Sequence, residues 1–146
     1  MIGRRPNWEK LLAEFLESRR DRLFLWGSHD CALFTCDAIE AMTGEDLARA
    51  ARGKYDGPNG AAAFLEDETG GGGLDSYVSM VATRNGLEEV GLKLARRGDV
   101  MLWNHPRTGP ALGIVGLDGT HALFARAGKG FERWPVLRCT RAWRVP

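Results

Sequence analysis

The hydrophobic residues of this chain follow a helical spacing up to about residue 86 and a strand-like spacing after it. In the first part apolar side chains recur every three or four positions, whereas the second part consists of short apolar runs separated by turn residues. Helices followed by strands, without alternation between them, favour an α+β fold with an antiparallel sheet or small barrel. The length of 146 residues fits one domain. We therefore expect a single domain over 1–146, with N-terminal helices (about 1–86) packed on C-terminal strands (about 87–146).

The clearest helix is predicted over residues 6–19, with Asn7 as its expected N-cap. Its apolar stripe consists of Trp8, Leu11, Leu12, Phe15 and Leu16. A second helix is expected over about 30–42, capped by Asp30 and ended by Thr43-Gly44. Three shorter helices are expected over 45–52, 59–68 and 74–84. The four glycines at 70–73 separate the last two as a turn.

The predicted strands are all short, and turn residues separate them. They cover residues 87–90, 100–103, 112–117, 122–127, 130–135 and 142–145. Asp118-Gly119 lies between two apolar runs, which is a typical sequence for a hairpin turn.

The net charge of +1 is unevenly distributed, because residues 37–92 carry −7 and residues 93–146 carry +7. This division is compatible with an ordinary solvated surface, with attraction between the two parts, or with an anionic partner. The five tryptophans are scattered and lack interleaved basic residues, so we do not expect nucleic-acid binding. No apolar run is long enough to span a membrane, and the first residues do not resemble a secretion signal. Three cysteines without zinc-type spacing favour a reducing compartment, and we expect neither a metal nor a cofactor.

Cys31 is the residue at which several chemical cues coincide. It follows an aspartate at the start of a predicted helix, where the helix dipole favours a thiolate and lowers the thiol pKa. A small cysteine at a helix start is also a common core residue, so both interpretations stay open. A nucleophile further requires a base, and the histidines are His29, just across the bend, His105 in an exposed turn, and His121 at a strand start.

Three motifs resemble those of the NlpC-type cysteine peptidases, which are papain-like α+β domains that cleave cell-wall peptides. The motifs are Asp30-Cys31-Ala32-Leu33-Phe34, Arg97-Gly98-Asp99-Val100-Met101 and Leu112-Gly113-Ile114-Val115. More closely, W-G-x-H-D-C-A-L-F from Trp26, T-G-x-D from Thr43 and the terminal R-A-W-R-V resemble a small family of phage and prophage proteins. Genes of that family tend to lie among those for tail assembly.

The resemblance implies roles for individual residues. Cys31 matches the nucleophile, and His121 matches the third, orienting polar residue. Asp30 matches the aspartate that helps hold the amino terminus of the substrate, and Trp26 of the same motif is a candidate substrate-binding residue with it. The position of the catalytic histidine is taken by Ala111, which cannot accept a proton.

The resemblance therefore implies a tail-associated protein that acts in assembly or binding, with other tail or hub proteins as partners and without peptidase activity. Its expected location is the host cytoplasm during assembly and then the virion tail, without a secretion signal. The alternative is an active cysteine hydrolase that acts on peptidoglycan peptides, with Cys31 as the nucleophile and His121 or His29 as the base.

Overall fold

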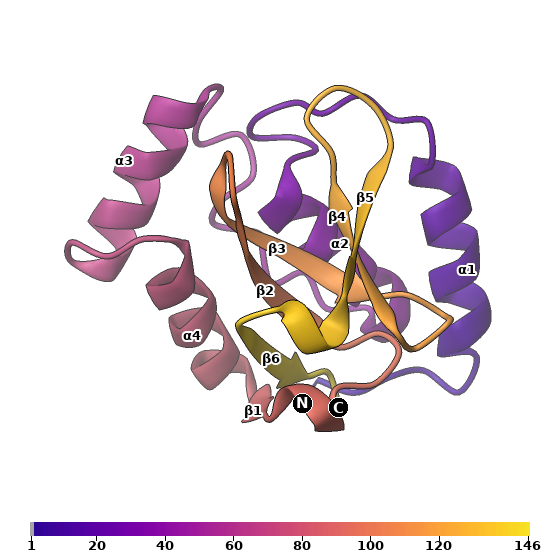
Figure 1. The fold of residues 1–146 in the computed structure, drawn as a ribbon. Coiled ribbons are helices and arrows are strands. Elements are labelled where there is room, and N and C mark those ends of the chain that lie inside the picture. Colours follow the sequence, from indigo (N-terminus) through magenta and orange to yellow (C-terminus); the bar gives the residue numbers. More distant parts are fainter. Residues whose placement is uncertain (1) are drawn as a thin grey trace.

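The computed structural model describes residues 2–146 and has the expected α+β class (Figure 1). Its helices are α1 (Trp8–Arg19), α2 (Cys31–Thr43), α3 (Pro58–Thr69) and α4 (Leu74–Asn85). Its strands are β1 (Glu88–Val90), β2 (Val100–His105), β3 (Gly109–Val115), β4 (His121–Ala125), β5 (Phe131–Pro135) and β6 (Arg141–Arg144). Two short 3₁₀ helices, η1 (Leu92–Leu94) and η2 (Val136–Arg138), lie in the β part.

The six strands form one antiparallel sheet in the order β1-β6-β2-β3-β4-β5. The last strand, β6, lies between β1 and β2, so the C-terminal residues are an internal part of the sheet. Because neighbouring residues of a strand point to opposite faces, the sheet has two separate apolar cores. Leu112 and Ile114 face the core shared with α1, α2 and α4. Trp103 and Phe124 belong to the other core, which is closed by residues of η1 and η2.

The helices are short, and α2, with 13 residues, is the longest. A helix needs about 20 apolar residues to cross a bilayer. Within residues 2–146, no helix has the length and hydropathy required for such a crossing.

Capping and turn residues in the sequence correctly predicted where several helices and strands begin or end. The side chain of Asp30 caps α2 by accepting a hydrogen bond from the backbone N–H of Leu33, as predicted. Gly44 ends α2 with a left-handed φ of 84°. Asp118-Gly119 forms the turn between β3 and β4, and Gly119 also has a positive φ.

Asn7 is the N-cap residue of α1, as predicted, but its side chain makes no capping hydrogen bond. The prediction of a helix over 45–52 was wrong, because residues 45 and 46 are irregular and residues 47–53 form consecutive turns. The physical reason lies in Asp46, whose carboxylate accepts hydrogen bonds from the backbone N–H of Ala48 and from the guanidinium of Arg52 and so holds the chain in a turn.

The β2–β3 hairpin is longer than predicted, because the Gly109-Pro110 sequence that resembles a loop is already part of β3. His105, expected to be exposed in this turn, is only 8% exposed. Its Nδ1 accepts a hydrogen bond from the backbone N–H of Arg107, and its Nε2 lies 3.2 Å from the carboxylate of Glu132 on β5. His105 therefore stabilises the hairpin with both ring nitrogens.

A buried carboxylate joins the two ends of the chain. Asp99, which directly precedes β2, is fully buried and accepts hydrogen bonds from the guanidinium of Arg4 (2.8 Å) and the backbone N–H groups of Arg96 (2.8 Å) and Val145 (3.1 Å). The backbone N–H of Arg4 also donates to the carbonyl oxygen of Pro146, so the termini lie side by side (Figure 1).

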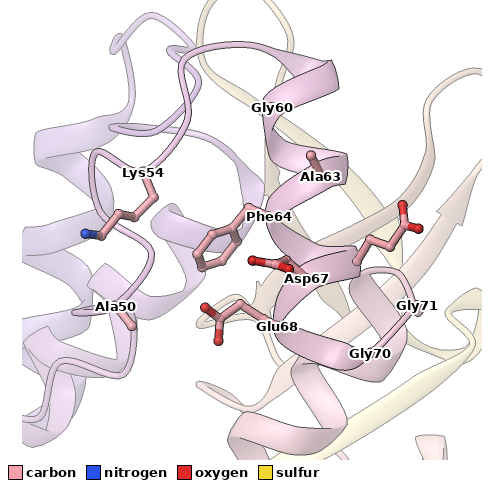
Figure 2. Close-up of a pocket in the computed structure, with 10 residues that line it drawn as sticks. Ala50, Lys54, Gly60, Ala63, Phe64, Asp67, Glu68, Gly70 and Gly71 are labelled. Carbon is pink, nitrogen blue, oxygen red and sulfur yellow. The ribbon is translucent and has the colours of Figure 1, made fainter.

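An open groove lies between α3 and the turn at residues 50–54 (Figure 2). Its volume is about 1080 Å³, and we call it the α3 groove. The lining residues are Ala50, Lys54, Gly60, Ala63, Phe64, Glu66, Asp67, Glu68, Gly70 and Gly71.

Candidate functional site

The start of α2 is held by Asp30, which is 1% exposed. One carboxylate oxygen accepts the hydrogen bond from the N–H of Leu33 (2.9 Å). The other accepts hydrogen bonds from the N–H of Gly27 (3.1 Å) and from the hydroxyl of Tyr55 (2.8 Å). Both carboxylate oxygens of Asp30 are therefore bound to groups inside the protein. These hydrogen bonds fix the start of α2, and neither oxygen is left without a partner to bind a substrate ammonium group.

Tyr55 is a residue of this site that the sequence analysis missed, because it lies 25 positions from Asp30 and in no recognisable motif. Gly27 packs directly against it. Gly27 has a φ of 79°, and a Cβ at this position would lie 1.9 Å from the carbonyl oxygen of Tyr55. The N–H of Gly53 donates to the carbonyl oxygen of Gly27 (3.0 Å). The bend before α2 and the turn at 53–55 thus form one unit.

Trp26, the other candidate binding residue, lies in the same bend. It is half-buried, and its ring packs edge-to-face on Phe24 with 5.0 Å between ring centroids. Trp26 and Asp30 therefore lie in the same bend, which the hydrogen bond from the N–H of Gly27 to Asp30 closes.

Cys31 is the first residue of α2 and packs against the core between the sheet and the helices. Part of the residue reaches the surface, but burial raises the pKa of its thiol to about 11. The backbone of Leu112 is within hydrogen-bonding reach of the thiol and acts in the opposite direction, with a smaller effect. The lowering of the pKa expected from the helix start is thus outweighed by desolvation, and the thiol is neutral at pH 7.

The side chain that β3 presents toward α2 beside Cys31 is Leu112. Ala111 packs with the opposite core, and its cross-strand partner Trp103 belongs to that core as well. Gly113 has the same orientation, because a Cβ built on it would meet Phe124 of the opposite core. Position 111 therefore faces away from Cys31, and the β3 side chain that shares a core with Cys31 is the apolar Leu112.

His29 is 1% exposed and lies toward α1. Its Nδ1 is 3.5 Å from a guanidinium nitrogen of Arg19, and its ring meets Phe34 edge-on with 6.0 Å between ring centroids. Its Nε2 is buried, with no hydrogen-bond partner in residues 2–146. Burial lowers the pKa of His29, and the nearby charges of Arg22 and Arg19 lower it further.

His121 begins β4, within one residue of the prediction, but lies far from Cys31. Its Nδ1 is 3.0 Å from the hydroxyl of Thr120 and 3.4 Å from the carboxylate of Asp118, and its side chain is 37% exposed. Its carbonyl oxygen accepts from the N–H of Gly116. Gly116 is four residues beyond Leu112, about 13 Å at the rise of a strand. The structure therefore does not bring His121 and Cys31 together.

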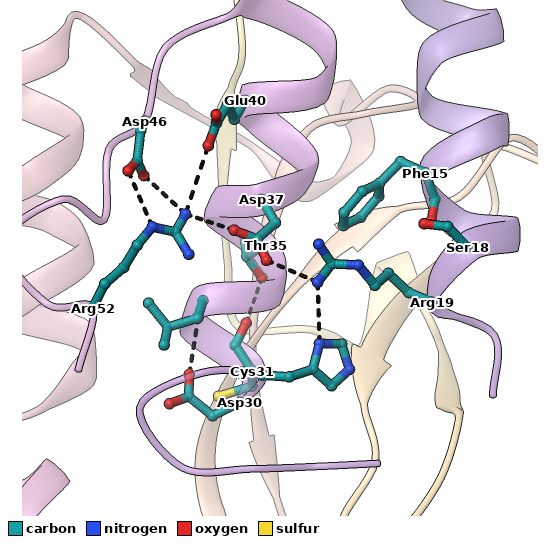
Figure 3. Close-up of polar contacts among 12 residues, drawn as sticks. Phe15, Ser18, Arg19, Asp30, Cys31, Thr35, Asp37, Glu40, Asp46 and Arg52 are labelled. Atoms are coloured by element: carbon teal, nitrogen blue, oxygen red, sulfur yellow. Dashed lines mark hydrogen bonds and ion pairs between the residues drawn. The ribbon is translucent and has the colours of Figure 1, made fainter. Parts of the chain in front are cut away.

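A partly buried ion network on the other side of α2 was not predicted (Figure 3). Asp37 pairs with Arg19 of α1 (2.9 Å) and with Arg52. Arg52 also binds Asp46 through two nitrogens, at 2.9 and 3.0 Å, and lies 3.7 Å from Glu40. Hydrogen bonding to Asp46 raises the pKa of Arg52. This network holds both α1 and the 45–55 turns against α2, which explains why Asp37 and Arg52 are charged residues in a half-buried place.

The buried His29 predicts a specific pH dependence of stability. Its pKa in the folded state lies below the ordinary value of about 6.5, so below that pH the unfolded chain binds a proton that the folded chain resists. We expect the free energy of unfolding to fall with decreasing pH below about 6.5, by at most about 1.4 kcal/mol per pH unit from this residue. Urea unfolding at pH 7.5 and 5.5 measures this change. His29→Phe should remove it, whereas His121→Gln should retain it; equal slopes in all three proteins would contradict the assignment.

No three His, Cys, Asp or Glu side chains of residues 2–146 are grouped in a way that could hold a metal ion. The fold and site thus define an α+β domain with a partly buried cysteine at the aspartate-capped start of its central helix. A family model described as a domain of unknown function, DUF6950, matches residues 3–145, and the chain belongs to this family. A search of curated proteins gives no match.

Proposed function

We propose that this chain is a papain-like domain of the NlpC type that acts in the assembly of a phage or prophage tail, by binding and not by peptide hydrolysis. The absence of peptide hydrolysis in this proposal is inferred from the surroundings of Cys31. Its thiol is desolvated beside Leu112, and burial raises its pKa to about 11.

The arrangement of the three motifs supports the first half of the proposal. Cys31 opens a helix that packs against β3, which carries the Leu112–Val115 motif. The Arg97–Met101 motif leads into the adjacent strand β2. A cysteine at a helix start against a central antiparallel sheet is the arrangement that the resemblance to the NlpC-type peptidases implies.

Hydrolysis would require a thiolate and a base, and the observed contacts disfavour both. Burial raises the pKa of the Cys31 thiol to about 11, which favours the neutral thiol over the thiolate near pH 7. His29 lies toward Arg19, His105 toward Glu132 and His121 toward Asp118. The carboxylate that would bind a substrate amino terminus, that of Asp30, is engaged by three internal hydrogen bonds.

The tail role rests on the resemblance of the Trp26–Phe34, Thr43–Asp46 and Arg141–Val145 motifs to phage and prophage proteins. The partners in this proposal are other tail or hub proteins, in the host cytoplasm during assembly and then in the virion tail. Peptidoglycan peptides are the substrate in the competing hydrolase hypothesis.

Deletion of the gene from its phage or prophage and complementation with wild-type protein or Cys31→Ala tests the proposal. We expect deletion to reduce the number of tailed particles seen by electron microscopy, and we expect both proteins to restore it. Cys31→Ala should change the free energy of unfolding by about 1 kcal/mol, as point changes commonly do. Wild-type protein should release no amino groups from purified peptidoglycan above the level of the variant.

Two results would contradict the proposal in different ways. Normal tails after deletion would refute the assembly role. A folded Cys31→Ala variant that fails to complement, together with amino-group release by the wild-type protein alone, would establish the hydrolase instead.

A further inference from the structure

The negative charge of the α3 groove lies where the helix itself disfavours it. Glu66, Asp67 and Glu68 occupy the last turn of α3, which contains no basic residue. Carboxylates at a helix C-terminus meet the negative end of the helix dipole and destabilise the helix. None of the three forms an ion pair within the described residues 2–146. The acidic end of the groove therefore keeps its negative charge available to a basic partner.

The groove is also shaped to admit apolar side chains. Gly60, Ala63 and Phe64 lie along one face of α3, at helical spacing, and the opposite wall carries Ala50 and Lys54 (Figure 2). Glycine and alanine leave room for the side chains of a visiting segment, and the half-buried Phe64 offers it an apolar surface. With Lys54 included, the charged lining residues sum to −2.

A second surface of the same chain has the opposite character. Leu23 and Leu25, which are 67% and 59% exposed, are two residues apart on an extended segment. This segment is bonded to the β4–β5 loop, since the N–H of Phe24 donates to the carbonyl oxygen of Gly128. The exposed basic residues around it are Arg22, Arg126 and Lys129, none of which forms an ion pair within residues 2–146. We call these five residues, Arg22, Leu23, Leu25, Arg126 and Lys129, the leucine tip.

The charge of the two surfaces is not neutralised within one molecule. Across the described residues, the pair Glu89–Arg141 is the one ion pair that joins the acidic stretch 37–92 to the basic stretch 93–146. Asp21, next to the leucine tip, is paired with Arg20 and so removes little of its positive charge. In Figure 1 the α3 helix lies at one side of the molecule, and the β4–β5 hairpin rises apart from it.

We propose that the leucine tip of one copy of this chain docks into the α3 groove of a second copy. The two leucines enter between α3 and the 50–54 turn, and the basic residues of the tip face Glu66, Asp67 and Glu68. Because the two surfaces differ, the contact is head-to-tail and repeats, so that copies form a ring or a filament. This inference does not depend on whether Cys31 is catalytic.

A charge-swap experiment with the full chain tests the contact. The tip variant carries Arg22→Glu and Lys129→Glu, and the groove variant carries Glu66→Lys and Glu68→Lys. Each variant alone places like charges on both of its surfaces, and we expect association measured by sedimentation velocity to weaken about 100-fold. Mixing the two variants puts opposite charges together at both contacts, so the mixture should associate about as strongly as the wild-type protein. Raising NaCl from about 0.01 M to about 1 M should dissociate the wild-type assembly, because the Debye length falls from about 30 Å to about 3 Å.

The matched control uses the other exposed leucines, Leu94 and Leu137, which lie on η1 and η2 beside Lys93 and Arg138. The variant Lys93→Glu with Arg138→Glu makes the same charge change and should associate like the wild-type protein. Circular dichroism checks that every variant is folded.

Three results would each overturn the proposal. The first is a wild-type protein that stays monomeric at low salt up to high concentration. The second is a mixture of the two swap variants that remains dissociated. The third is loss of association in the control variant, which would place the contact at η1 and η2. If the monomeric wild-type protein instead bound anionic phospholipid vesicles through Leu23 and Leu25, the tip would be a lipid-binding surface.

Discussion

Replacement of Asp99 by alanine should lower the free energy of unfolding by about 3–5 kcal/mol, as is typical when one partner of a buried ion pair is removed. The guanidinium of Arg4 and the backbone N–H groups of Arg96 and Val145 would then lose their common acceptor. Domains of this size are stable by only about 5–15 kcal/mol, so the variant should be close to unfolding at 37 °C. Urea titration followed by tryptophan fluorescence measures the loss.

A control for this variant is Glu9→Gln, which removes an exposed carboxylate paired with Arg97 at 2.8 Å. Since exposed ion pairs contribute about 0–1 kcal/mol, the control should be almost as stable as the wild-type protein. If Asp99→Ala and Glu9→Gln were equally stable, the buried carboxylate would not hold the termini together as described.

Replacement of Gly27 by alanine should be the second most destabilising change, with an expected loss of about 3 kcal/mol. A left-handed backbone costs a residue other than glycine about 1–3 kcal/mol. The added Cβ would also lie 1.9 Å from the carbonyl oxygen of Tyr55 and force that residue to move. Movement of Tyr55 weakens its hydrogen bond to Asp30 and so loosens the start of α2. Urea unfolding gives the loss, and faster alkylation of Cys31 reports the local opening.

Gly53→Ala provides the matched control. Gly53 has a similar φ of 70°, but a Cβ there would meet nothing within 4 Å. The control should therefore lose only the conformational cost of about 1–2 kcal/mol. If both variants lost the same amount, the contact between Gly27 and Tyr55 would contribute nothing to the site.

The sequence predicted the elements that depend on near neighbours. The stripe of Trp8 to Leu16 marked α1, Asp30 and Gly44 marked the ends of α2, and Asp118-Gly119 marked a hairpin turn. These signals work because a helix cap or a turn is made by residues within about four positions of each other. The prediction of a helix at 45–52 failed because the carboxylate of Asp46 holds the chain in a turn by binding Ala48 and Arg52, and Arg52 is itself fixed by Asp37 on α2, a contact 15 residues away that no local pattern shows.

The candidate site was only partly predictable for the same physical reason. Cys31 and Asp30 were predicted at the start of α2, because an aspartate directly before a run of helical spacing is a typical N-cap. The partner of Asp30 is Tyr55, 25 residues away, and the neighbour of Cys31 is Leu112, 81 residues away. No local pattern encodes such contacts. The sequence therefore could not show that both oxygens of the Asp30 carboxylate accept internal hydrogen bonds, or that the side chain of Ala111 faces away from Cys31.

By itself, the sequence determined the α+β class, the positions of four helices and the strands, and a cysteine at a capped helix start, because hydrophobic period and capping chemistry act over a few residues. Only the tertiary structure decided the chemical state of that cysteine. The helix start favours a thiolate, but packing against the sheet removes water from the thiol, and burial raises its pKa to about 11. Desolvation depends on everything that surrounds a group in space, and that is set by the fold as a whole.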